Sequence, residues 1–190
     1  MADLDLGVLI ARCQAGDELA WEAFVRRFQG RVYALACSYL DDRDEARDLA
    51  QEVFVRLYET RGRWAEAEGF VAWLCQVARN RAIDYQRRRR VRQPPRVVPV
   101  EEGVQVADVS PGPAEQLEHR SRHRLVQAAL ARLSTLSREI VMLRDVQELS
   151  VRDVATLLGI PAGTVKSRAS RARVELAEEV LALGREQGQP

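Results

Sequence analysis

The chain has 190 residues, of which 46% are hydrophobic and 30% charged, which predicts one large or two small globular domains and excludes a disordered chain. Its apolar runs are too short to cross a bilayer and its acidic start lacks the basic segment of a secretory signal, so we expect no membrane insertion and a cytoplasmic location. The net charge of +1 excludes a uniformly basic nucleic-acid-binding protein. Three cysteines without paired spacing, Cys13, Cys37 and Cys75, predict reduced, buried thiols rather than a zinc site.

Helical periodicity dominates the N-terminal half, where no strand pattern is evident. A short helix over about Leu4–Gln14 precedes a long helix whose apolar side spans residues 21–39. Asp42 and Glu45 have the spacing of a capping box at the start of a third helix. A fourth helix is predicted over about 70–90, and it ends in four consecutive arginines.

Proline density marks the boundary between two halves of the chain. Five of the seven prolines lie between Val91 and Pro113, where they block helix formation and predict an interdomain linker at 93–114. The helical pattern resumes near Glu115. The predicted fold class is all-α, with an acidic, proline-containing linker between two small helical domains at 1–92 and 115–184 and a tail at 185–190.

Residues 148–176 have the layout of a helix-turn-helix. Ser150 and Asp153 have capping-box spacing at the start of its first helix. Gly159 stands where a left-handed C-terminal cap belongs, and Pro161 stands where the next helix begins. The second helix has a buried stripe of Val165, Ala169, Ala172, Leu176 and Val180. Its other faces carry small and basic residues suited to a DNA major groove: Lys166, Ser167, Arg168, Ser170, Arg171 and Arg173. The alternative is an ordinary helical hairpin with a solvated arginine face.

Charge is segregated along the chain. Residues 41–59 hold seven acids and three arginines, whereas residues 79–96 hold eight arginines and one acid. Residues 99–118 hold five acids and no base, and residues 163–173 hold four bases and no acid. This alternation predicts contact with a polyanion at two places and with a different partner elsewhere. For the acidic helix 44–54 the alternatives are a solvated face and a docking face for a basic protein.

The helix over 70–90 places aromatic residues beside arginines, a combination that binds unpaired bases and phosphates. Asn80 and Asp84 are one helical turn apart and carry side chains that read base edges. The candidate set for single-stranded nucleic acid is Trp64, Trp73, Arg79, Asn80, Asp84, Tyr85, Arg87 and Arg88. The alternatives are a core position for Trp73 and a solvated end for the arginine block.

Three motifs, in this order and separation, resemble those of bacterial sigma factors of the sigma-70 family, in the small two-domain extracytoplasmic-function (ECF) group. Glu45–Phe54 resembles the family's helix that binds core RNA polymerase. Phe70–Asp84 and the arginine block resemble its promoter-melting and −10 recognition element. Leu136–Arg173 resembles its −35 reader, and Gly163–Arg168 is particularly close. The resemblance covers nearly the whole chain.

This resemblance implies a subunit without enzymatic activity or a cofactor, which binds core polymerase and directs promoter-specific initiation. Its implied partners are the clamp helices of the largest polymerase subunit, the flap for the C-terminal domain, single-stranded DNA at −10, duplex DNA at −35 and an anti-sigma factor that stress displaces. The implied polymerase-binding residues are Asp48, Leu49, Gln51, Glu52 and Phe54. Thr164 joins the six polar and basic residues of the helix-turn-helix as a −35 contact.

Other classes of protein are weighed against this interpretation. A stand-alone helix-turn-helix regulator leaves the −10-like helix and the acidic face unexplained, and it would dimerise on a palindrome. A sigma-like interaction protein would bind a protein partner but neither promoter element. An enzyme is the poorest candidate, because no nucleophile, base and orienting group form a set. His119 and His123 have the spacing of a metal-binding pair but lack further ligands, so we expect no metal.

Overall fold

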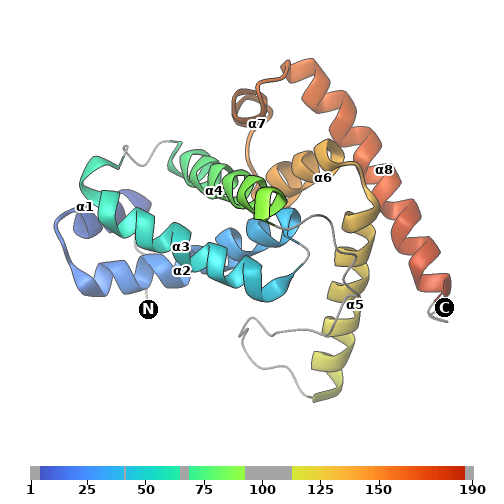
Figure 1. Ribbon diagram of the computed structural model, residues 1–190, viewed down its shortest axis with the longest axis horizontal. Helices are drawn as coiled ribbons and strands as arrows, with labels where there is room; N and C mark the ends of the chain where they lie inside the picture. The colour runs from blue at the N-terminus through green and yellow to red at the C-terminus, as the bar shows by residue number, and fades with distance from the viewer. Residues whose placement is uncertain (1–4, 41, 65–68, 93–112, 187–190) are drawn as a thin grey trace. The chain divides into compact units, whose positions relative to one another are not determined.

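The computed structural model (Figure 1) is helical and without strands throughout its described residues, which are 5–40, 42–64, 69–92 and 113–186. The predicted all-α class is confirmed. The chain divides into two compact units, Met1–Val104 and Gln105–Pro190. Nearly all of the predicted linker at 93–114 lies outside the described residues. Over the same described ranges, no helix combines the length and the apolar character that a membrane span requires.

Within the described residues, the first unit consists of α1 (Leu6–Gln14), α2 (Glu18–Tyr39), α3 (Arg43–Thr60), the 3₁₀ turn η1 (Arg61–Arg63) and α4 (Phe70–Arg92). α2 is the central helix, because α1, α3 and α4 all pack against it (Figure 1). α3 and α4 also pack against each other. The acidic helix and the arginine-rich helix therefore lie side by side.

Aspartates start the first three helices of this unit. Asp5 accepts a hydrogen bond from the amide of Gly7 (2.9 Å), and Asp17 accepts one from the amide of Ala20 (3.0 Å). Asp42 accepts from the amide of Glu45 (3.1 Å). The predicted pair Asp42 and Glu45 thus begins α3 through the Asp42 side chain, whereas the Glu45 carboxylate accepts a hydrogen bond from Arg89 of α4.

The core of the first unit is aromatic where α2, α3 and the start of α4 meet. Phe24 and Phe70 are fully buried, with ring centroids 5.8 Å apart. Trp64 lies 4.7 Å from Phe24 and 5.3 Å from Phe70, and its indole Nε1 donates to the carbonyl of Leu57 on α3 (3.1 Å). These contacts hold α4 at a defined position on α2 and α3.

The cysteines lie in helices of the first unit, as small apolar side chains. Cys13 and Cys75 are buried, and Cys37 is half-buried. Burial raises the pKa of the Cys13 and Cys75 thiols to about 11, so both carry their protons at neutral pH. Among the residues that the structure describes, no group of His, Cys, Asp and Glu has the arrangement of a metal site. The side chains of His119 and His123 lie outside that description.

Within the described residues, the second unit consists of α5 (Pro113–Arg132), α6 (Thr135–Val141), the π-helical segment η2 (Met142–Val146), α7 (Val151–Leu158) and α8 (Ala162–Glu186). α5, α6 and α7 all pack against α8 (Figure 1). α8 is therefore the central helix of this unit, and its last two residues lie within the predicted tail at 185–190.

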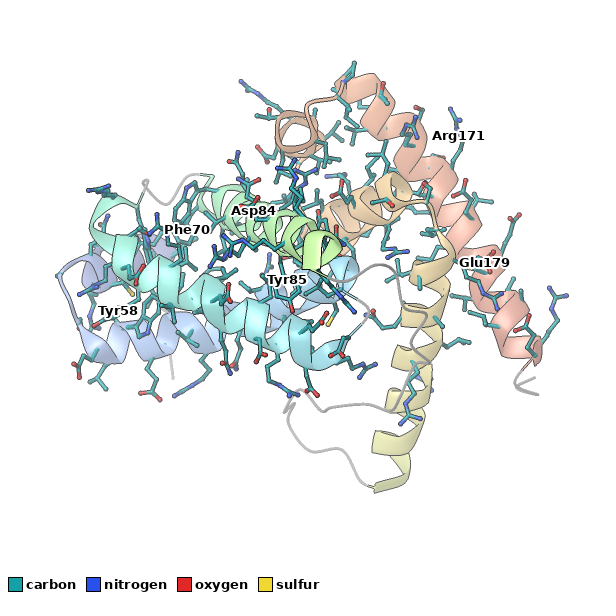
Figure 2. The ribbon with its side chains drawn as sticks, in the orientation of Figure 1. Tyr58, Phe70, Asp84, Tyr85, Arg171 and Glu179 are labelled. Carbon is teal, nitrogen blue, oxygen red and sulfur yellow. The ribbon has the colours of Figure 1, made fainter. Side chains whose placement is uncertain are left out.

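Arginine side chains fix both ends of the α5–α6 connection. The Arg138 guanidinium donates to the carbonyl of Leu130 in the last turn of α5 (2.8 Å). Arg132 pairs with Glu179 (3.1 Å) and Glu186 (3.3 Å) of α8, and Figure 2 shows Glu179 in the C-terminal half of that helix. These contacts tie α5 to the distal part of α8.

The predicted helix-turn-helix geometry is confirmed. Ser150 and Asp153 form a reciprocal capping box, in which the Asp153 amide donates to Ser150 Oγ (3.1 Å) and the Ser150 amide to Asp153 Oδ2 (3.3 Å). Gly159 ends α7 in the left-handed region with φ 67°. The Val165 amide donates to the Pro161 carbonyl (3.1 Å) as α8 begins. Local sequence signals therefore determine where both helices start and stop.

Candidate polymerase and DNA interfaces

The N-terminal half of α8 divides its side chains by face. Val165, Ala169 and Ala172 are at most 5% exposed and pack against the rest of the second unit. Thr164 is half-buried, and the predicted DNA-binding side chains are exposed, namely Lys166, Ser167, Arg168, Ser170, Arg171 and Arg173. Figure 2 shows Arg171 projecting away from the helix axis. This face offers cations for phosphates and small polar groups for base edges.

The basic residues of this face differ in how they are held. Among the residues that the structure describes, none forms an ion pair with Lys166, Arg168 or Arg171. Arg173 instead makes a bidentate pair with Asp145 of η2, with Nε to Oδ2 at 3.0 Å and Nη2 to Oδ1 at 2.5 Å. Hydrogen bonding to Asp145 raises the pKa of Arg173, so its charge is permanent.

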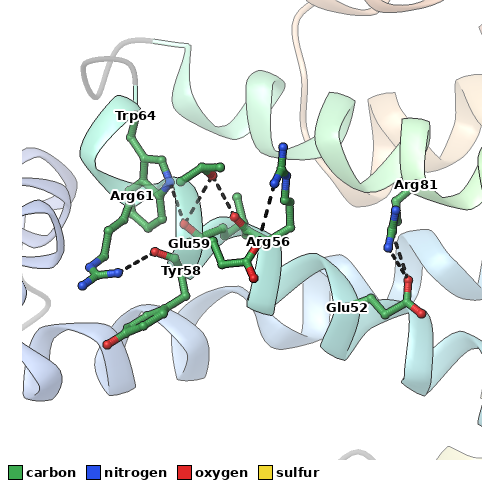
Figure 3. Close-up of polar contacts among 9 residues, drawn as sticks. Glu52, Arg56, Tyr58, Glu59, Arg61, Trp64 and Arg81 are labelled. Carbon is green, nitrogen blue, oxygen red and sulfur yellow. Dashed lines mark hydrogen bonds and ion pairs between the residues drawn. The ribbon is translucent and has the colours of Figure 1, made fainter.

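Trp64 is a core residue, which corrects its prediction as a surface that stacks on bases. Its side chain lies against Phe24 and Phe70, it is 6% exposed, and its indole proton is used by the carbonyl of Leu57 (Figure 3). Both ring faces are therefore unavailable to a base. Trp73 is half-buried, with its ring centroid 5.3 Å from that of Phe70, so part of its surface remains accessible.

The remaining predicted −10 residues of α4 lie at different depths. Asn80, Asp84, Arg87 and Arg88 are exposed, whereas Arg79 and Tyr85 are half-buried. Asp84 is 4.0 Å from Arg87 one turn later. Burial and the neighbouring carboxylate of Glu45 raise the pKa of Tyr85, which therefore remains a neutral hydrogen-bond donor. The exposed set forms a polar strip along α4.

The predicted polymerase-binding residues of α3 occupy two faces. Asp48, Gln51 and Glu52 are exposed and share one side of the helix, and Phe54 is half-buried against the ring of Trp21. Leu49 is only 1% exposed. Its assignment to a contact surface is wrong, because spacing of three and four residues places it on the core side; it supports the helix from within.

Among the side chains that the structure describes, two ion pairs join α3 and α4, and the sequence interpretation missed both. Arg81 donates through Nε (3.0 Å) and Nη2 (2.9 Å) to Glu52, as Figure 3 shows, and Arg89 Nη1 lies 2.5 Å from Glu45. Glu45 and Glu52 are two helical turns apart, and so are Arg81 and Arg89. The matched spacing is visible in the sequence, but it predicts these ion pairs only once the two helices are known to pack antiparallel.

Two exposed apolar side chains, Val55 (59% exposed) and Tyr58 (40%), were also missed. They continue the i, i+3, i+4 spacing of Asp48, Gln51 and Glu52, so they lie on the same face of α3. The Arg61 guanidinium sits 4.0 Å above the Tyr58 ring and donates to its backbone carbonyl, which holds the aromatic side chain in place. The acidic face therefore has an apolar end.

Comparison with known proteins agrees with this arrangement. The pattern of sigma-70 region 2 matches residues 24–92, and the pattern of sigma-70 region 4 matches residues 123–176. The RNA polymerase sigma-H factor of Pseudomonas aeruginosa is 30% identical over 183 residues, covering 94% of this chain and 95% of that protein. The ECF RNA polymerase sigma-E factor of Escherichia coli is 29% identical over 182 residues, covering 93% and 94%.

Solved structures share the fold. A co-crystal structure of the sigma factor RpoE with the anti-sigma factor NepR from Bartonella quintana matches with a TM-score of 0.65 at 25% identity, covering 84% of this chain and 95% of RpoE. The fold and the exposed basic helix thus define a helical DNA-binding protein of the transcription machinery. The chain belongs to the sigma-70 family of RNA polymerase sigma factors, in its ECF group.

Membership of this family establishes the function in outline. The protein binds core RNA polymerase and promoter DNA and directs initiation at promoters, and it is not an enzyme. This outcome agrees with the main prediction from the sequence rather than with a stand-alone regulator or a sigma-like interaction protein.

Proposed function

We propose that three surfaces divide the work of promoter recognition. The exposed side of α3 docks on the clamp helices of the largest polymerase subunit, α4 captures the opened −10 strand, and the N-terminal half of α8 reads the −35 duplex. The observation that carries this proposal is that Lys166, Arg168 and Arg171 are exposed, with no ion pair to any described residue, on a correctly capped helix-turn-helix. Recognition helices of this type enter the major groove by their N-terminal residues.

In α8, the outward residues have complementary tasks. Arg168 and Arg171 have the length and the donor geometry for guanine edges, whereas Ser167, Ser170 and Thr164 suit nearby bases or sugar–phosphate oxygens. The small size of Gly163 and Ser170 on the outward side keeps the helix thin enough for a groove about 12 Å wide.

In α4, the exposed strip of Asn80, Asp84, Arg87 and Arg88 and the accessible part of Trp73 carry the contacts to single-stranded DNA. Arginines hold the phosphates, the amide and carboxylate read base edges, and the indole supplies a stacking surface. Trp64 contributes indirectly, because it fixes the start of α4 from inside the core.

In α3, the docking face comprises Asp48, Gln51 and Glu52, with Val55 and Tyr58 extending it. Acids beside exposed apolar groups fit a partner that presents basic and apolar side chains. The C-terminal unit makes the second polymerase contact, with the flap. Phe54 stiffens the face through its contact with Trp21.

An anti-sigma factor regulates the protein in this proposal. The Bartonella quintana relative was solved with such a partner, and a protein that covers the docking or DNA faces would block holoenzyme formation until stress displaces it. The site of action is the cytoplasm, where bacterial transcription occurs.

Charge reversal at Asp48 tests the docking face. Asp48→Arg places a cation where the partner is basic, so we expect pull-down of core RNA polymerase to fall at least about tenfold. Glu22→Arg is the matched control, because it reverses an exposed acid of the same unit that lies on α2 and not on the docking face of α3. Normal retention of polymerase by Asp48→Arg, or equal loss in both variants, would refute the assignment.

A further inference from the structure

Arg173 is held differently from the other cations of the recognition helix. The Asp145 carboxylate accepts from its Nε and Nη2, which leaves three of the five guanidinium protons pointing elsewhere. The Arg173 side chain is 52% exposed and that of Asp145 is 32% exposed. The pair therefore lies at the surface, with the outer edge of the guanidinium open to a ligand.

Asp145 stands on a rigid base. It belongs to the π-helical segment η2, whose Met142 and Leu143 are at most 2% exposed. The amide of Gln147 donates to the Met142 carbonyl (2.9 Å), and Gln147 is itself 1% exposed. Local π-helical geometry of this kind is frequent at functional sites. Here the segment carries the carboxylate that pairs with Arg173 of α8.

The position of Arg173 along α8 indicates what it meets on DNA. It lies 11 residues after Ala162, about 16 Å along the helix axis. The major groove is about 12 Å wide, so a helix that inserts its first turns among the bases brings Arg173 to the groove wall. Lys166 is seven residues earlier and lies on the same side of α8.

We infer that Arg173 is a phosphate contact at the edge of the −35 element, and that Asp145 is the positioning residue that orients it. The inference rests on the proposed role of α8 as the −35 reader. The bidentate pair fixes the guanidinium plane, so less rotamer entropy is lost when the outer protons meet a phosphate. Asp145 thereby assists binding to a polyanion although it carries a negative charge itself.

Because Asp145 is negatively charged, two accounts of its role predict opposite changes in DNA affinity when the carboxylate is removed. If Asp145 acted only through its charge, its removal near DNA would strengthen binding, because one repulsive group would be lost. If it positions Arg173, its removal weakens binding although the protein becomes more basic. Asp145→Asn keeps the shape and removes the charge, so the two accounts predict opposite changes.

The experiment measures equilibrium binding of reconstituted holoenzyme to a promoter fragment identified by run-off transcription, over a range of salt concentrations. We expect Asp145→Asn to weaken binding about threefold to tenfold and Arg173→Ala about tenfold or more, with the slope of log K against log salt smaller by about 0.9 in Arg173→Ala. In the Arg173→Ala background, Asp145→Asn should have no further weakening effect, because its target is gone. Asp145→Glu should recover part of the loss.

Glu178→Gln is the matched control, since it removes one exposed acidic charge from α8 itself, in a turn beyond Arg173, and should leave binding unchanged or slightly tighter. Unchanged or tighter binding by Asp145→Asn, or full additivity in the double variant, overturns the positioning role. If Arg171→Ala weakens promoter binding but Arg173→Ala does not, the inference about Arg173 and Asp145 is wrong, and the proposed role of α8 at the −35 element stands. Unchanged binding in Arg171→Ala and Arg173→Ala alike overturns the assignment of α8 to the −35 element.

Discussion

The recognition helix of the second unit and the α3–α4 pair of the first unit use charge in opposite ways. In α8, Lys166, Arg168 and Arg171 stand exposed on a face whose opposite side is made of small buried residues. Between α3 and α4, by contrast, Arg81 and Arg89 are paired with Glu52 and Glu45. Arginine content alone therefore does not identify a DNA-binding surface, because the exposure of each arginine and the protons that its partner leaves free also matter.

The two regions also differ in which contacts define them. The helix-turn-helix depends on signals within a few residues, such as the box of Ser150 and Asp153 and the turn at Gly159. The α3–α4 contacts join residues 29 and 44 positions apart. A substitution in the first region should change one local property, whereas a substitution in the second should change two surfaces at once.

The largest expected effect is on stability, at the two tryptophans that the sequence assigned to the −10 contact. Trp64 is a core residue, whereas part of Trp73 is accessible to DNA. Trp64→Ala removes a buried ring and a hydrogen bond, and should lower the free energy of unfolding by about 3–5 kcal/mol. Trp73→Ala, at a half-buried position, should cost less stability. Chemical denaturation measures both. Equal, small losses would show that Trp64 is not a core residue.

Arg171→Ala should weaken binding of the holoenzyme to its promoter by about 1–3 kcal/mol if the side chain contacts a base, without altering stability. Arg185→Ala is the control, because it removes an exposed arginine from the far end of the same helix. Titration of a promoter fragment measures both variants. Unaltered binding by Arg171→Ala would remove this residue from the −35 set.

Backbone strain at the turn gives a smaller effect. Gly159→Ala forces a side chain into the left-handed region (φ 67°), so the free energy of unfolding should fall by about 1 kcal/mol even though the added methyl group meets no neighbour within 4 Å. Gly163→Ala lies inside α8 with similar open space and should be neutral or stabilising by about 0.5–1 kcal/mol. In thermal unfolding, we expect the melting temperature to fall in Gly159→Ala and to stay the same or rise in Gly163→Ala. A fall in both variants, or a rise in both, would contradict this account.

The smallest stability change is expected at the α3–α4 seam. Glu52→Gln breaks an ion pair whose two side chains are 47% and 38% exposed, so the free energy of unfolding should change by less than about 1 kcal/mol. The same variant should still reduce retention of core polymerase, because Glu52 belongs to the docking face. A large loss of stability with normal polymerase binding would show that Glu52 stabilises the fold and does not belong to the docking face.

Sequence patterns predicted the fold well where the determining contacts are local. Helical periodicity and caps located the helices of both units, and the outward face of α8 followed from the spacing of Val165, Ala169 and Ala172. Leu49 was assigned to the docking surface by family resemblance, although its own spacing places it on the core side. Sequence patterns failed for Trp64, whose burial depends on its contacts with Phe24 of α2 and Phe70 of α4. The pairing of Arg81 with Glu52 was missed for the same reason, since no local pattern shows which helices are neighbours.

Run-off transcription tests the central claim most directly. Core RNA polymerase is incubated with genomic DNA fragments alone, with this protein, and with its Arg171→Ala variant. The account predicts new start sites that require the protein, that share two upstream elements, and that weaken with the variant. No protein-dependent start sites despite stable binding to core polymerase, or start sites that the variant uses equally well, would contradict promoter reading by α8.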